Sequence, residues 1–124
     1  ANKWYQLGAN QGFSLAQTNL GRQYADGYGV TKDFREANKW FLKAAEQGDD
    51  EAQVRLGFNY QYGKGVLQNN IKSHMWYNIS SANGNELSGE WRDKLAAKMT
   101  AKDISEATAM ARECMKNDYK KCGY

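Results

Sequence analysis

Residues 14–48 read SLAQTNLGRQYADGYGVTKDFREANKWFLKAAEQG, and residues 50–84 read DEAQVRLGFNYQYGKGVLQNNIKSHMWYNISSANG. When the second stretch is placed on the first with an offset of 36 residues, its characteristic residues coincide. Three tryptophans, Trp4, Trp40 and Trp76, follow the same offset, and so do the glycines at positions 12, 48 and 84. A fixed period of this length indicates stacked repeat units, each a small piece of regular structure.

The first half of each unit is expected to be a helix that ends at a glycine turn. In residues 14–26, Ala16, Leu20 and Tyr24 recur every four positions, which places them on one helical face. The Gly-x-Gly motif that begins at Gly27 then ends the helix, because glycine readily adopts the left-handed backbone of a helix terminus.

The second half of each unit is expected to be another helix. In the first unit it covers residues 33–47 and begins at the N-cap Asp33. Its apolar stripe consists of Ala37, Trp40, Phe41, Ala44 and Ala45. The next unit repeats the pair over residues 50–62 and 69–83. Because two helices cannot bury both of their apolar faces alone, the units must stack.

The two ends of the chain depart from the repeat. Residues 1–12 read as the second helix of a partial unit, so we expect a fragment or a processed form. After residue 84 the glycine turn is missing, and Thr100 opens a capping-box pattern before a last helix over residues 101–116. The predicted units are residues 1–12, 13–48, 49–84 and a C-terminal cap, 85–124. The chain is therefore predicted to be an all-α solenoid of 36-residue helix-turn-helix repeats.

These residues resemble the Sel-one-like repeat (SLR) family, a relative of the tetratricopeptide-repeat solenoids. The family pattern is A-x-x-x-L-G-x-x-Y-x-x-G-x-G-V, then an acidic residue, A-x-x-W and K-A-A-x-Q-G. The first unit carries it at Ala16, Leu20, Gly21, Tyr24, Gly27, Gly29, Val30, Asp33, Ala37, Trp40 and residues 43–48. The second unit departs from it at Asn69 and Ser73. The resemblance implies a right-handed superhelix that serves as an adaptor or scaffold, without catalytic residues shared across the family.

Composition excludes several classes of protein. The 124 residues are 41% hydrophobic and 25% charged, which is typical of a globular domain. No apolar run approaches the ~20 residues of a membrane span, and no signal peptide is recognised at the start. The net charge of +3 is mild, whereas a nucleic-acid-binding module carries a denser basic stripe. We expect neither a membrane span nor binding to nucleic acid.

The two cysteines, Cys114 and Cys122, lie near the end of the chain without a CxxC motif or a cysteine–histidine cluster. This pattern argues against a zinc site. The cysteines can pair if the tail folds back on the last helix, and the bond would contribute roughly 2–3 kcal/mol. Such a bond persists only in an oxidising compartment. We favour the disulfide, with two free thiols in a cytosolic protein as the alternative.

No motif predicts a catalytic residue, a metal ligand or a cofactor site. His74 has nearby serines but no third orienting group, so it is expected to be an ordinary residue on a helix surface. The carboxylates of residues 49–51 stand at a helix start, where they favour the helix dipole. The periodic tryptophans are expected to pack in the core or between repeats. Trp91 breaks the period and is the better candidate for a specific contact, although cap packing is favoured.

Candidate contact residues come from positions that vary between the units. Thr18, Arg22 and Asp26 in the first unit become Val54, Phe58 and Tyr62 in the second. Large apolar groups on this face are unexpected for a solvated helix, and aromatics and arginine are common interface anchors. The predicted partner-binding set on the concave face is Arg22, Arg55, Phe58, Asn59 and Tyr62. The alternative is packing against the neighbouring repeat, which is favoured for Val54 and equally open for Phe58 and Tyr62.

The expected function is that of a non-enzymatic adaptor that binds a partner protein on its concave face. We expect a monomer without cofactors, located in the periplasm or secreted, with the cytoplasm as the alternative. An immunity-type inhibitor of a secreted toxin is a second hypothesis, suggested by the resemblance. An enzyme acting on a cell-wall-derived small molecule is a third, disfavoured because the sequence offers no convergent polar constellation.

Overall fold

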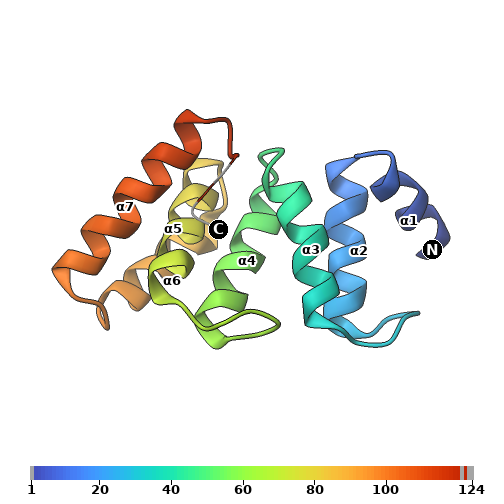
Figure 1. The fold of residues 1–124 in the computed structure, drawn as a ribbon, viewed down its shortest axis with the longest axis horizontal. Helices are drawn as coiled ribbons and strands as arrows, with labels where there is room; N and C mark the ends of the chain where they lie inside the picture. Colours follow the sequence, from blue (N-terminus) through green and yellow to red (C-terminus); the bar gives the residue numbers. More distant parts are fainter. Residues whose placement is uncertain (1, 121, 123–124) are drawn as a thin grey trace.

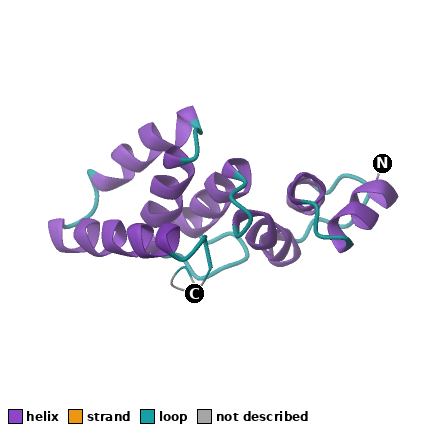
Figure 2. Ribbon diagram, turned by 90° about the horizontal axis from the view of Figure 1, so that it is seen from above, coloured by secondary structure: helices purple, strands orange, loops and turns teal. Residues whose placement is uncertain are grey.

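The computed structural model describes residues 2–120 and 122, and over these residues the chain forms seven α-helices and no strand (Figures 1 and 2). The helices are α1 (Asn2–Asn10), α2 (Ser14–Asp26), α3 (Phe34–Ala45), α4 (Asp50–Tyr62), α5 (Asn70–Ala82), α6 (Glu86–Ala96) and α7 (Ala101–Lys116). From α1 to α6 each helix packs on the next, and α7 packs on α5. The predicted all-α helical-repeat solenoid is confirmed.

The helices begin and end where their capping residues stand. Asp33 accepts hydrogen bonds from the backbone N–H groups of residues 35 and 36, and Thr100 accepts one from Asp103. Gly27 and Gly63 end α2 and α4 in the left-handed conformation, with φ of 75° and 66°. The predicted bounds of these helices are confirmed to within two residues, because they depend on local capping chemistry.

Buried hydrogen bonds repeat with the sequence period. The side-chain amide of Gln17 donates to the carbonyl of Ala9 at 3.2 Å, and that of Gln53 donates to Ala45 at 3.0 Å. The second bond is the first one shifted by 36 residues along the chain. Each first helix is therefore tied to the end of the preceding second helix in the same way. Since a buried amide without a partner would cost about 1–3 kcal/mol, these glutamines fix how one unit meets the next.

The two helices of each unit approach closely at a glycine. A Cβ placed on Gly21 would lie 2.6 Å from the Phe41 ring, and one placed on Gly57 would lie 2.5 Å from the Tyr77 ring. Both rings are fully buried. The Leu–Gly element of the repeat therefore leaves room for the aromatic side chain of the partner helix.

The C-terminal cap contains two helices instead of the single one expected from the sequence. Helix α6 follows the N-cap Asn85 and packs on α5, in the place of a first helix of the repeat. It lacks the Leu–Gly pair and the glycine turn, yet Leu87, Trp91 and Leu95 recur every four residues. This helical spacing of apolar residues is the sequence pattern from which α6 could have been predicted.

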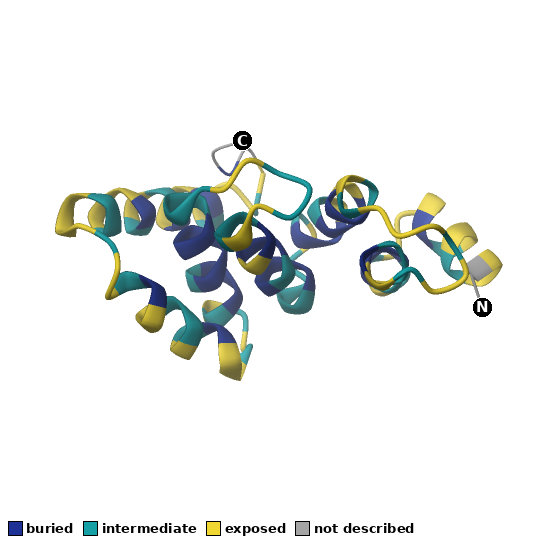
Figure 3. Ribbon diagram, turned by 90° about the horizontal axis from the view of Figure 1, so that it is seen from below, coloured by how far each residue is buried: buried dark blue, intermediate teal, exposed yellow. Residues whose placement is uncertain are grey.

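The expectation that all three periodic tryptophans are packed is wrong for Trp4. Trp40 and Trp76 are buried, whereas Trp4 on α1 is 76% exposed. Trp40 packs against Ala9 and Leu20 of the preceding helices. No helix of the described residues lies in the equivalent place beside α1, and most of the α1 residues whose burial is described are exposed (Figure 3).

The tail beyond α7 folds back and is held by a disulfide. Cys114 and Cys122 are joined, with Cα atoms 4.7 Å apart, and both are buried. Between them, the Tyr119 hydroxyl donates to the Asn83 side chain at 2.9 Å, and its ring lies against Gly48. The tail therefore contacts the turns that follow both α3 and α5, and it covers that end of the core.

Candidate partner-binding groove

A groove runs along the side of the solenoid formed by α2, α4 and α6, the first helices of successive units. Its main hollow has a volume of about 500 Å³, and both apolar and charged side chains line it. Val54 and Phe58 come from α4, and Leu87 and Trp91 come from α6. A second hollow of about 460 Å³ shares Phe58 and Trp91 with the first. These two aromatic residues therefore stand where the hollows meet.

Exposed aromatic rings form the wall of the groove. Phe58 and Tyr62, one turn apart on α4, have ring centroids 4.8 Å apart. Trp91 of α6 lies 6.4 Å from Phe58. Phe58 is 37% exposed and Tyr62 is 59% exposed, so a large part of each ring faces solvent. Packing and binding were equally open for these two residues; each ring packs against a neighbouring ring and still leaves part of its surface in solvent.

Buried neighbours hold this wall in place. Tyr77 of α5 packs edge-on against Trp91 at 6.1 Å, and its hydroxyl donates to Gln61 at 2.7 Å. Burial raises the pKa of the Tyr77 hydroxyl to about 12, so the proton of this hydrogen bond is retained at physiological pH. Val54 is buried with Tyr77 and Leu95, which confirms the packing role that was favoured for it.

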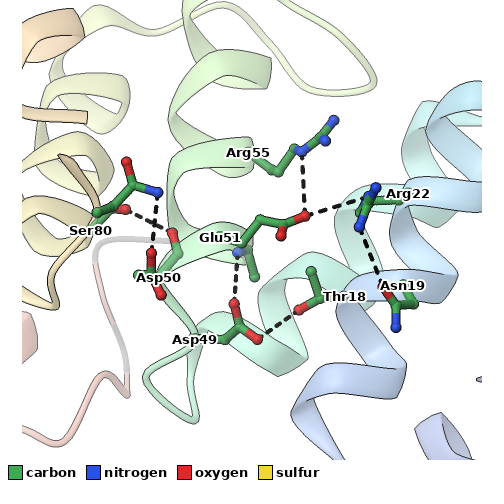
Figure 4. Close-up of polar contacts among 10 residues, drawn as sticks. Thr18, Asn19, Arg22, Asp49, Asp50, Glu51, Arg55 and Ser80 are labelled. Atoms are coloured by element: carbon green, nitrogen blue, oxygen red, sulfur yellow. Dashed lines mark hydrogen bonds and ion pairs between the residues drawn. The ribbon is translucent and has the colours of Figure 1, made fainter. Parts of the chain in front are cut away.

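Two of the predicted contact residues meet at one carboxylate. Arg22 Nε of α2 lies 3.5 Å from Glu51 Oε2, and Arg55 Nε lies 4.0 Å from the same oxygen (Figure 4). All three side chains are close to half exposed, so each ion pair contributes at most about 1 kcal/mol. Glu51 orients the two guanidinium groups without occupying all of their donors.

The start of α4, which carries Glu51, is anchored on both sides (Figure 4). Asp49 caps the helix by accepting from the Ala52 N–H, and its other oxygen accepts from the buried Thr18 hydroxyl of α2 at 3.0 Å. Ser80 of α5 donates to the Asp50 carbonyl at 2.7 Å. The carboxylates of Asp49 and Glu51 thus act at a helix start, as expected, and they also link α4 to α2, while the backbone carbonyl of Asp50 links α4 to α5.

Asn59 does not offer the exposed contact that was expected of it. It lines the groove but is only 4% exposed, and its amide donates to the Asn38 side chain at 2.6 Å. Asn38 in turn donates to the carbonyl of Lys64 at 2.8 Å. Asn59 therefore positions the glycine turn of its own unit against α3. The sequence pattern could not show this, because Asn38 is 21 residues from Asn59 and 26 residues from Lys64.

His74 was expected on a helix surface, and this expectation is wrong. The side chain is buried, and its Nδ1 makes no hydrogen bond with the described residues. Burial lowers the pKa of His74, the charge of Arg92 lowers it further, and Asp93 opposes the shift. Arg92 and Asp93 both belong to α6, a helix that the repeat pattern did not predict.

No metal or membrane feature stands out in the part of the chain that the structure describes. Within residues 2–120 and 122, no group of three or more histidine, cysteine or acidic side chains could hold a metal ion. None of the helices found there is long and apolar enough to cross a bilayer.

Lysines at the groove were not singled out by the sequence. Lys32 and Lys64 line the main hollow, and Lys94 and Lys98 line the second. They come from two turns and from the α6 region, at positions that do not follow the 36-residue period, so no repeat signal marks them. The placement of α6 brings the last two beside the aromatic wall.

Comparison with known proteins assigns the chain to a family. The family model described as Sel1 repeat matches residues 1–13, 14–49 and 50–85. No curated protein matches the chain. Repeats of this type generally mediate protein–protein interaction and typically serve as non-enzymatic scaffolds.

Two solved structures are similar in fold and sequence. A protective antigen present in uropathogenic Escherichia coli strains, displaying an SLR fold, matches with a TM-score of 0.92 and 35% identity over 98% of this chain. A Sel1 repeat protein from Oxalobacter formigenes matches with a TM-score of 0.72 and 38% identity over 75% of it. The chain spans only 26% and 27% of those two proteins. With repeat matches over residues 1–85 and these structural relatives, the chain belongs to the Sel1 repeat family.

Proposed function

We propose that this chain is a binding module that holds a segment of a partner protein in the groove between α2, α4 and α6. The observation that carries the proposal is the exposed aromatic wall of Phe58, Tyr62 and Trp91. Large rings that stay partly in solvent cost free energy unless another surface covers them. Aromatic and arginine side chains are also the most frequent anchors of protein interfaces, and Arg55 lines the same hollow.

The geometry of the wall supports binding over accidental exposure. Tyr77 and its bond to Gln61 hold the Trp91 side of the wall rigid, so little side-chain entropy is lost when a partner docks. The two hollows on either side of Phe58 can each receive a side chain of the bound segment. An extended segment and an amphipathic helix both fit this description.

The test is the double variant Phe58→Ala/Tyr62→Ala, compared with wild type for binding to a partner captured from the native source. If the wall contains the main anchors, the dissociation constant rises by about thirtyfold or more, which corresponds to ~2 kcal/mol. Circular dichroism shows whether the variant is folded. Unchanged affinity in a folded variant would rule out the site.

A matched control comes from the other end of the solenoid. Phe13 and Tyr28 are also exposed, and they line neither hollow of the groove. The variant Phe13→Ala/Tyr28→Ala removes the same two ring types from a surface outside the proposed site. It should bind as wild type does, and an equal loss would mean that exposed rings in general contribute to binding.

We further propose that the protein is monomeric and works in an oxidising compartment, the periplasm or the extracellular space. The buried disulfide between Cys114 and Cys122 supports this location, since cytosolic thiols are kept reduced. Fractionation of the source cells, with the redox state of both cysteines trapped by alkylation, tests the proposal. Recovery of the reduced protein in the cytosol would contradict it.

A further inference from the structure

We propose that the segment bound by this groove is acidic and carries an aromatic or large aliphatic anchor. This inference rests on the proposed binding function and names the chemistry of the partner. Five cationic side chains line the two hollows, namely Lys32, Arg55, Lys64, Lys94 and Lys98. Among the residues that the structure describes, only two acidic side chains do so, Asp26 and Glu51. Five positive and two negative side chains give the groove a net charge of +3, which equals the formal net charge of the whole chain.

Two of the three cations that line the main hollow are held over an aromatic ring. Lys32 Nζ lies 5.2 Å from the centroid of Phe34, and Lys64 Nζ lies 5.1 Å from it. A ring face attracts ammonium groups but supplies no hydrogen-bond acceptor as strong as a carboxylate. Neither lysine forms an ion pair with any residue of the described chain. The ring thus gathers two like charges beside the hollow and leaves their N–H donors free for an anionic ligand.

The second hollow provides cations on the other side of the aromatic wall. Lys94 and Lys98 line it together with Phe58, Tyr62 and Trp91. Lys94 makes one ion pair, with Glu90 at 3.2 Å, and both of these side chains are well exposed. Such a pair is weak and exchanges readily for another carboxylate. The aromatic anchor site therefore has lysines on both flanks.

The acidic groups of the groove do not cancel this charge. Glu51 forms ion pairs with both Arg22 and Arg55. Because one carboxylate faces two guanidinium groups, the three side chains together keep a net charge of +1. Asp26, the other carboxylate, stands at the end of α2. A segment with carboxylates on both sides of an apolar residue would match the order of lysines, aromatic wall and lysines.

A protein segment fits this surface better than a nucleic acid. The main hollow is lined by the aliphatic side chains of Val54 and Leu87 as well as by rings, and this lining suits an apolar side chain. The cations of the hollows are separated by apolar rings and by the carboxylates of Glu51 and Asp26, so they offer no continuous basic path along a phosphate backbone. Single-stranded binders instead track the backbone with an uninterrupted basic groove.

The experiment is a selection of random peptides displayed on phage against the immobilised full chain, followed by affinity measurements on synthetic copies of the enriched peptides. The peptides are expected to carry more Asp and Glu than Lys and Arg, with at least one aromatic or large aliphatic residue. Their affinity should fall as salt is raised, because exposed charges are screened. A labelled single-stranded oligonucleotide is measured in parallel as the competing anionic ligand.

Two double variants with the same change of net charge separate the contributions. Lys32→Glu/Lys98→Glu reverses one cation in each hollow, and the dissociation constant should rise by roughly tenfold or more. Lys102→Glu/Lys116→Glu makes the same change on α7, away from both hollows, and should leave the affinity close to wild type.

The outcomes distinguish this inference from the function on which it rests. Enriched peptides that are neutral or basic, or that bind the Lys32→Glu/Lys98→Glu variant as well as wild type, would overturn the acidic partner while the groove stands. Tighter binding of the oligonucleotide at the groove would overturn it as well. Peptides that bind Phe58→Ala/Tyr62→Ala unchanged, or a selection that enriches none, would overturn the groove function and this inference together.

Discussion

Replacing Gly57 with alanine is expected to destabilise the fold, although alanine is the better helix former. Gly57 lies inside α4, where the exchange would gain about 1 kcal/mol from helix propensity alone. The added Cβ, however, would lie 2.5 Å from Cδ1 and 2.6 Å from Cε1 of Tyr77. The outcome depends on whether that ring can move.

The surroundings of Tyr77 allow little movement. The ring is fully buried, packs with Val54, Leu95 and Trp91, and is tied to Gln61 through its hydroxyl. To restore ordinary contact the ring or α4 must shift by close to an ångström, which corresponds to the upper part of the 1–3 kcal/mol range for overpacking. After the gain in propensity is subtracted, we expect a net loss of about 2 kcal/mol.

Urea unfolding followed by far-ultraviolet circular dichroism measures this change. If the unfolding free energy falls by about 2 kcal/mol for each 1 M of urea, a loss of about 2 kcal/mol lowers the unfolding midpoint by about 1 M. The control is Gly89→Ala in α6, where the nearest atoms to the new Cβ are the Ser81 hydroxyl at 3.2 Å and the end of Arg92 at 3.9 Å. Since both can rotate away, the control should gain up to about 1 kcal/mol. Equal stability of Gly57→Ala and wild type, or an equal loss in the control, would refute the packing argument.

Two further predictions concern protonation and the disulfide. Burial and Arg92 hold the pKa of His74 below its ordinary value of 6.5, with Asp93 opposing. The unfolded chain therefore binds the proton first, and the unfolding free energy should fall as the pH drops from 6.5 through the folded pKa. In urea titrations at a series of pH values below 6.5, His74→Gln should lack this fall in unfolding free energy. A variant with the same pH profile as wild type would contradict the prediction. Breaking the bond between Cys114 and Cys122, which closes a loop with a sequence separation of 8, should cost about 2.5 kcal/mol. Urea titrations with and without reductant test it, and identical midpoints would contradict it.

The parts of the fold that depend on local chemistry were predictable from the sequence. Asp33, Gly27 and Thr100 act within their own turns, so the helix bounds they set agree with the structure. Helix α6 was not placed because it keeps neither the Leu–Gly pair nor the glycine turn of the repeat. His74 lies on α5, against which α6 packs, so its burial could not be foreseen without that helix.

The site was predictable only where it depends on the composition of one helix face. Phe58, Tyr62 and Arg55 lie on α4, and their place in the groove follows from helical spacing. Asn59 follows Phe58 directly in the sequence, and at that position its side chain points to α3 and is buried. The lysines of the groove come from segments that only the folded chain brings together.

The repeat itself shows that the aromatic wall is not required by the fold. The equivalents of Phe58 and Tyr62 in the first unit are Arg22 and Asp26, which are both exposed, and that unit forms the same helix pair with the same buried glutamine bond. The position equivalent to Val54 is Thr18, and both side chains are buried. The packing of the solenoid therefore constrains this position, but not the positions of Phe58 and Tyr62 on the same helix face. If packing alone decided the residues at 58 and 62, charged side chains would serve there as they do at 22 and 26. The rings are thus an addition to the scaffold, and their removal should leave a folded chain in which only binding is changed.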